Sequence, residues 1–100
     1  MKFNKQLLES LINEETVPLD ENYEEITDKD LLEEYDNMKL ISKEYYPIYN
    51  HKQRFTVIWS YKDKFYLKVG CFDGENIVFN TDECTEVRPA EVTVTQYIPV

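Results

Sequence analysis

Apolar residues near the start of the chain recur at the spacing of one face of an α-helix. They stand three or four positions apart and are separated by polar residues. These apolar residues are Phe3, Leu7, Leu8, Leu11 and Ile12. The pattern predicts an amphipathic helix over residues 3–13, and Pro18 prevents its continuation. Residues 14–26 show no such period, so we expect an irregular acidic connection there, with a turn at residues 20–22.

A second stripe at helical spacing follows this connection. Its members are Leu31, Tyr35, Met38, Ser42 and Tyr45. Thr27 and Asp30 have the spacing of a capping box, and Pro47 marks the end of the stripe. We therefore expect a helix over residues 28–45 that turns Leu31, Tyr35 and Met38 inward. The acids expected to face solvent are Glu33, Glu34 and Asp36.

From residue 51 the hydrophobic period changes to two, which is the spacing of a half-buried β-strand. The alternation is clear over residues 55–59 and 65–69, and a polar turn lies between them. Asp73-Gly74 is a favoured hairpin dipeptide and leads into a strand over residues 76–79. Two further strands are predicted over residues 84–87 and 91–98.

These elements predict a single α+β domain over residues 1–100. Two N-terminal helices come first, and residues 51–100 form a four- or five-stranded antiparallel β-sheet, a meander, packed against them. The chain has 100 residues, of which 42% are apolar, so it can bury a core without disulfides or metals. No apolar run is long enough to span a membrane, and residues 1–11 do not resemble a secretory signal. We expect a cytoplasmic protein, in the cytoplasm of a bacterial host if a phage encodes it.

Charge changes this picture, because it is concentrated in one part of the chain. Asp and Glu number 20 against 11 Lys and Arg, which gives a net charge of −9. Residues 14–36 hold eleven acids and a single base, Lys29, so this stretch alone carries −10. Such a balance excludes a general nucleic-acid coat and disfavours docking on anionic lipid. The acidic stretch is either a solvated face or a surface for a basic partner.

Residue patterns for catalysis or cofactor binding are missing from the sequence. Phosphate-binding glycine loops, zinc-protease motifs and nucleophile elbows do not occur, and His51 is the single histidine. Cys71 and Cys84 lack metal-ligand or redox spacing, and we expect both to be reduced thiols. We therefore expect a protein that is not an enzyme and that holds no cofactor and no metal.

The run Tyr45-Tyr46-Pro47-Ile48-Tyr49 is the main aromatic feature. Tyrosine is enriched at protein interfaces, because it buries a large area at low entropic cost and keeps a polar tip. The same residues suit packing between helix and sheet. Both interpretations stay open, and they can apply to different tyrosines of the run.

In size, charge and helix-then-sheet order the chain resembles small phage-encoded inhibitors, such as anti-CRISPR proteins and uracil-DNA glycosylase inhibitor. The resemblance implies a carboxylate-rich surface that mimics nucleic acid and binds the basic surface of a nucleic-acid-binding or nucleic-acid-processing host enzyme. Direct binding of nucleic acid or membrane is not expected, and the chain should be a monomer or weak homodimer. The candidate partner-binding residues are Glu21, Glu24, Glu25, Asp30, Glu33, Glu34, Asp36, Tyr46 and Tyr49.

Two other functions fit the same sequence. One is an immunity protein or antitoxin whose acids neutralise the basic active site of a cognate toxin. The other is a small virion or assembly protein that self-associates through the tyrosine run or through an exposed strand at residues 91–98.

Overall fold

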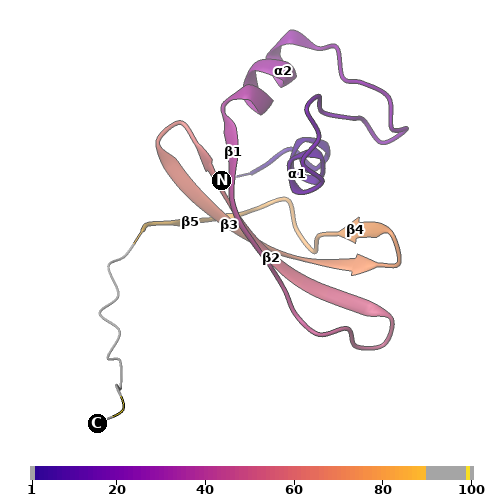
Figure 1. Cartoon of the computed structure of the whole chain (residues 1–100). Coiled ribbons are helices and arrows are strands. Elements are labelled where there is room, and N and C mark those ends of the chain that lie inside the picture. The colour runs from indigo at the N-terminus through magenta and orange to yellow at the C-terminus, as the bar shows by residue number, and fades with distance from the viewer. Residues whose placement is uncertain (1, 90–98, 100) are drawn as a thin grey trace.

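The computed structural model describes residues 2–89 and residue 99 of the chain. The helices are α1 (Lys5–Ile12) and α2 (Lys29–Asp36). The strands are β1 (Met38–Tyr45), β2 (Lys52–Tyr61), β3 (Lys64–Asp73), β4 (Asn76–Val78) and β5 (Thr85–Val87) (Figure 1). The predicted α+β class, with two helices and an antiparallel sheet, is confirmed. The strand predicted over residues 91–98 lies outside the described residues.

Helix α1 lies within the predicted range and is capped at both ends. The side chain of Asn4 accepts a hydrogen bond from the backbone N–H of Leu7 at 3.1 Å. At the other end, Lys43 Nζ donates to the carbonyl of Ile12 at 3.0 Å. A cation at this position satisfies an orphan carbonyl and interacts favourably with the helix dipole. The apolar face of α1 is therefore held in place from the neighbouring strand β1.

The second helix is much shorter than predicted, and the expected helix over residues 28–45 is wrong from residue 38 onward. Its N-cap is Asp28 and not Thr27, because the Asp28 carboxylate accepts hydrogen bonds from two backbone N–H groups of the first turn. The helix ends at Asp36, and residues 38–45 form strand β1. The predicted inward orientation holds for all three apolar residues: Tyr35 is buried, and Leu31 and Met38 are half-buried against the core, although Met38 belongs to the sheet.

A β-bulge explains why the sequence of β1 does not show the alternation of a strand. The pairing of β1 with β2 shifts between Leu40 and Ser42, so Ile41 is an extra residue. A bulge moves the inward-facing positions by one place along the strand. Leu40 pairs with buried Trp59 before the shift, and Lys43 pairs with buried Val57 after it. This change of face in the middle of the strand hides its alternation in the sequence.

The sheet has the order β1-β2-β3-β4, and β5 pairs with the same edge of β3 as β4 does, farther along it. Strands β2 and β3 are paired over their whole length, from Lys52 with Asp73 to Tyr61 with Lys64. Gly74 has a φ of 65° in the predicted Asp-Gly turn between β3 and β4. Antiparallel pairing of consecutive strands is therefore confirmed from β2 to β4, with β1 as an additional N-terminal member. Strand β5 pairs with β3 and not with β4, so the predicted meander does not extend to β5.

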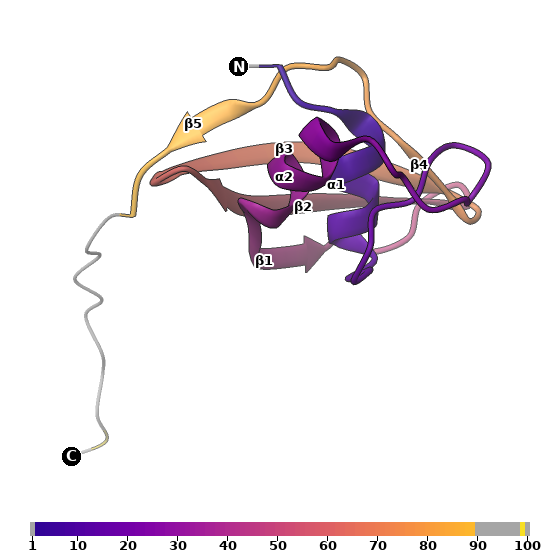
Figure 2. The ribbon, with the colours of Figure 1, turned by 90° about the horizontal axis from the view of Figure 1, so that it is seen from above.

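The core lies on the side of the sheet that carries the helices (Figures 1 and 2). Alternate residues of β2 face it, and these are Phe55, Val57 and Trp59. The same cluster contains the apolar residues of α1 together with Phe3, Tyr35 and Tyr66. We call this side of the sheet the inner face and the opposite side the outer face.

Two residues of β3 on the inner face have little freedom to change. Lys68 is buried, and its ammonium donates to Thr81 Oγ1 at 2.8 Å and to the carbonyl of Glu83 at 2.6 Å, which ties the β4–β5 connection to the sheet. A Cβ atom added at Gly70 would lie 2.5 Å from Cζ of Phe55 and 2.8 Å from Cε1 of Phe79. Only glycine fits beneath these two rings.

Candidate functional site

The acids predicted to bind a partner lie on two adjacent structures, a hairpin over residues 18–26 and helix α2. We call the hairpin the acidic hairpin. We call the predicted acids of both structures the acidic surface, which consists of Glu21, Glu24, Glu25, Asp30, Glu33, Glu34 and Asp36. All of them are exposed except Glu34, which is half-buried. A shallow depression of about 340 Å³ lies between the two structures, lined among others by Asp20 and Glu21 of the hairpin and Leu31 of α2.

The connection over residues 14–26 contains no helix or strand, and within it residues 18–26 form a hydrogen-bonded hairpin. Leu19 forms a β-bridge with Glu25, and the N–H of Ile26 donates to the carbonyl of Pro18 at 2.9 Å. Ser10 of α1 is buried, and its Oγ accepts a hydrogen bond from the N–H of Leu19 at 2.9 Å. The hairpin is thus fixed to α1 by one hydroxyl group.

The tip of the hairpin is shaped by Asp20. Its carboxylate accepts hydrogen bonds from the N–H groups of Asn22 at 2.8 Å and Glu24 at 3.0 Å. This arrangement is typical of an aspartate that organises a turn through its own neighbouring backbone. Tyr23 has a φ of 62° and is 79% exposed at the tip. The neighbouring Glu21 and Glu24 therefore project from a defined backbone.

A second anchor joins the acidic stretch to α2. The hydroxyl of Tyr35 donates to the carbonyl of Glu15 at 2.5 Å, and the Tyr35 side chain is buried. Burial raises the pKa of the Tyr35 phenol, and the nearby Glu15 carboxylate raises it further. The phenol therefore remains a hydrogen-bond donor across the physiological range.

Helix α2 holds its acids over a short distance. Asp30, Glu33 and Glu34 have i, i+3 and i+4 spacing, which places their side chains beside one another. The helix has 8 residues, so it is about 12 Å long, and the 18-residue helix predicted from the sequence would be about 27 Å. A nucleic-acid strand carries a charge every 3.4 Å or so, and α2 alone therefore matches only a few phosphates.

The acidic surface has few cations of its own. Within residues 2–89, the only acid of the stretch 14–36 in an ion pair is Glu14, whose carboxylate lies 3.4 Å from Lys43 Nζ. Lys43 is also the residue that caps α1. The acids of the acidic surface form no ion pair with a described residue. Their charges are exposed to solvent and repel one another.

The tyrosines of the aromatic run point in different directions. Tyr45 faces the inner side, where its ring stacks on Phe72 at 6.0 Å between centroids. Tyr46 lies on the outer face, with its hydroxyl 3.4 Å from Thr56 Oγ1. Tyr49 is 78% exposed in the turn that joins β1 to β2. All three tyrosines are exposed, but Tyr45 also packs against rings of the inner face, so Tyr46 and Tyr49 are the two that are available at the outer face.

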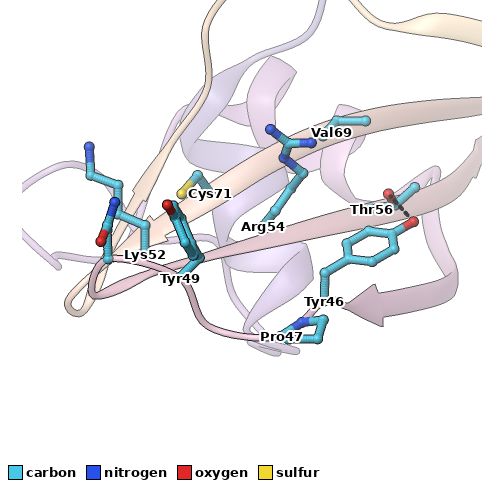
Figure 3. A pocket seen from close by; sticks show the side chains of 9 residues that line it. Tyr46, Pro47, Tyr49, Lys52, Arg54, Thr56, Val69 and Cys71 are labelled. Carbon is cyan, nitrogen blue, oxygen red and sulfur yellow. Dashed lines mark hydrogen bonds between the residues drawn. The ribbon is translucent and has the colours of Figure 1, made fainter.

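Tyr46 and Tyr49 line a pocket of about 780 Å³ on the outer face (Figure 3). The other lining residues are Pro47, Asn50, Lys52, Arg54, Thr56, Val69 and Cys71. Sequence reasoning named the two tyrosines but missed Lys52 and Arg54. The alternation of β2 could have found Arg54 and Thr56, because both stand between its inward residues.

The structure does not bring the predicted tyrosines and the acids of α2 into one site. Strand β1 separates Asp36 from Tyr46, and its 8 residues span about 25 Å. Tyr46 also lies on the outer face, whereas α2 lies on the side of the inner face (Figure 2). The nine predicted residues therefore form two separate surfaces.

The two cysteines also lie on opposite sides of the sheet. Cys71 lines the outer-face pocket, Cys84 belongs to the core cluster, and no disulfide joins them. Burial raises the pKa of the Cys84 thiol, so it is a poor nucleophile.

In the described part of the chain, no three metal-ligating side chains gather into a site, and no helix is long and apolar enough to cross a membrane. No protein-family model matches the chain, and no curated protein or solved structure shows significant similarity to it.

Proposed function

We propose that the protein is a small acidic inhibitor that binds the basic, nucleic-acid-binding surface of a partner protein through its acidic surface. The observation that supports this is a set of exposed carboxylates, held on an ordered scaffold, that form no ion pair within the described chain. A basic partner would supply the missing countercharges and steer fast association.

The scaffold matters as much as the charge. A disordered acidic tail loses conformational entropy on binding, and a surface that is already ordered loses less. Ser10 fixes the acidic hairpin, Tyr35 holds the preceding segment at Glu15, and Asp28 begins α2 with a side-chain cap. The proposed mimicry of nucleic acid rests on the hairpin and helix together, because α2 alone is too short to present a long row of charges.

The test compares two triple charge reversals that change the net charge equally. The first replaces Glu21, Glu33 and Asp36 of the acidic surface by lysine. The matched control replaces three exposed acids outside it, Glu44, Glu75 and Glu86, by lysine. A protein captured on the wild-type chain from bacterial lysate is produced in pure form, and its affinity for the three chains is measured by calorimetry.

The first variant should bind at least about tenfold more weakly than the control, because attraction becomes repulsion at the interface. Binding of the wild-type chain should weaken with salt, and duplex DNA or RNA should compete for the partner. Equal affinities of the two variants for the partner would contradict the proposal. So would an affinity of the wild-type chain that changes with neither salt nor added nucleic acid. The identity of the captured protein separates a nucleic-acid-processing enzyme from a cognate toxin.

A further inference from the structure

The outer-face pocket has a charge opposite to that of the molecule as a whole. Its lining includes two cations, Lys52 and Arg54, and no acid, although the chain contains 20 acidic residues. Neither cation forms an ion pair with a described residue. The pocket is therefore a region of this acidic protein that attracts an anionic ligand.

The backbone that carries the two tyrosines of the pocket is held by defined hydrogen bonds. The N–H of Tyr46 donates to the carbonyl of Arg54 at 2.9 Å, and its hydroxyl lies beside Thr56. Tyr49 and Lys52 exchange backbone hydrogen bonds of 2.8 and 3.0 Å across a tight turn. Figure 3 shows the two tyrosines on either side of Arg54, which projects from β2 between them.

The floor of the pocket belongs to the most regular part of the sheet. Arg54 pairs in register with Cys71, and Thr56 pairs with Val69. These four side chains share the outer face of β2 and β3, so the floor combines one cation, one hydroxyl and two apolar groups. The pocket volume of about 780 Å³ is in the range of small-molecule sites.

We propose that this pocket binds a nucleotide. Exposed aromatic rings beside Arg and Lys are the combination that proteins use to stack a base and hold its phosphate. The base lies against Tyr46 or Tyr49, and the phosphate is bound by Arg54 and Lys52, with Thr56 as a further hydrogen-bond donor. Arginine suits this role because its planar guanidinium can donate two parallel hydrogen bonds to a phosphate.

This inference does not depend on the acidic surface. The pocket uses the outer face of β2 and β3, and the acids lie on the acidic hairpin and α2. A variant of either surface leaves the other unchanged, so failure of one proposal does not imply failure of the other.

The first experiment is an NMR titration of the full 15N-labelled chain with AMP or GMP at constant ionic strength. Adenosine, ribose 5-phosphate and inorganic phosphate serve as partial ligands. AMP or GMP should give saturable shifts confined to residues 46–56 and 69–71. AMP should bind at least about tenfold more tightly than adenosine or phosphate alone, because only the nucleotide uses both the rings and the cations.

Substitutions then assign the two parts of the ligand. Arg54→Gln should weaken the binding of AMP about tenfold and leave the binding of adenosine unchanged. Tyr49→Leu should weaken the binding of both ligands. Both residues are exposed, so the variants should keep the wild-type melting temperature. The control is Lys64→Gln at the other end of the sheet, which removes one positive charge and should leave AMP binding unchanged.

Several results would overturn the nucleotide assignment. One is the absence of saturable shifts with either nucleotide at millimolar concentration. Another is equal affinity for AMP and inorganic phosphate, which would indicate an anion site without base recognition. A tighter complex with the acidic peptide Glu-Tyr-Glu than with AMP would assign the pocket to a peptide.

Discussion

The acidic surface and the outer-face pocket differ in charge, although fewer than 60 residues separate their members in the sequence. Residues 14–36 contain eleven acids and one base, whereas the pocket lining contains two bases and no acid. The net charge of −9 therefore describes neither surface. Partners are selected by local charge, and the two surfaces suit ligands of opposite sign.

The two regions also differ in what holds them. The pocket floor belongs to β2 and β3, which pair at ten successive positions. The acidic hairpin is fixed to the rest of the molecule by the buried side chain of Pro18 and by the hydroxyl of Ser10, and the hydroxyl of Tyr35 holds the segment before it at Glu15. We therefore expect substitutions that disrupt the sheet to destabilise the whole chain. Substitutions at the contacts that hold the hairpin should increase local opening of the hairpin alone.

The largest effect is expected from Gly70→Val. The added side chain would overlap Phe55 and Phe79, and such overpacking costs about 3 kcal/mol of unfolding free energy or more. Urea unfolding measures the loss. Gly74→Ala provides the comparison, because its Cβ meets no atom within 4 Å, and its cost of about 1 kcal/mol comes only from the positive φ. Equal losses would show that Gly70 is not closely packed.

Ser10→Ala should have an intermediate effect. It leaves the N–H of Leu19 without its acceptor, which costs about 1–3 kcal/mol when the group stays dry. Amide hydrogen exchange should accelerate over residues 14–26 and stay slow in β2 and β3. Uniform acceleration across the sheet would contradict the view that the hairpin is a separate, locally anchored unit.

Tyr35→Phe should cost about 1 kcal/mol at neutral pH, the usual value of one hydrogen bond. Because the fold raises the pKa of this phenol above 10.0, its contribution is present below the unfolded pKa and is lost as the pH rises through the folded value. The difference in unfolding free energy between wild type and variant should shrink in alkaline solution. A difference that stays constant up to pH 11 or so would contradict this assignment.

The smallest effect on stability is expected from the charge reversal of Glu21, Glu33 and Asp36. Exposed substitutions of this kind change the unfolding free energy by about 0.5 kcal/mol or less each. Relief of repulsion among the remaining acids opposes any loss. A melting temperature within a few degrees of wild type checks this, and a cooperative loss of structure would mean that these carboxylates support the fold.

The elements that could be predicted from the sequence are those in which one hydrophobic period runs without interruption. Helix α1 and the hairpins of β2, β3 and β4 follow from plain periods of 3.6 and 2 and from the Asp-Gly turn. Strand β1 was missed because the bulge at Ile41 breaks its alternation. Apart from its turn, the acidic hairpin was not predicted, because it depends on the bond between Leu19 and Ser10 and on the burial of Pro18, which no local pattern reveals.

The candidate sites, too, could be predicted only in part from the sequence. Exposure of most of the acids could be predicted from composition, and accessibility of Tyr46 and Tyr49 was one of two open interpretations. Lys52 and Arg54 become site residues only when the turn at residues 49–52 folds Tyr49 back toward β2. That turn has no glycine, and Asn50 and His51 adopt φ values of 51° and 62°. Its tightness is therefore hard to recognise from the sequence.

The bulge at Ile41 also bears on how the protein behaves at high concentration. Strand β1 is an outer strand of the described sheet, and a flat outer strand offers its unpaired backbone groups to another chain. The irregular pairing at Ile41 increases the local twist, and the exposed residues Lys39 and Glu44 place charges along the same strand. The edge of β1 is thus twisted and charged, and it offers a second chain no regular row of backbone groups for pairing. The residue that hid this strand in the sequence also makes its open edge a poor template for pairing with another chain.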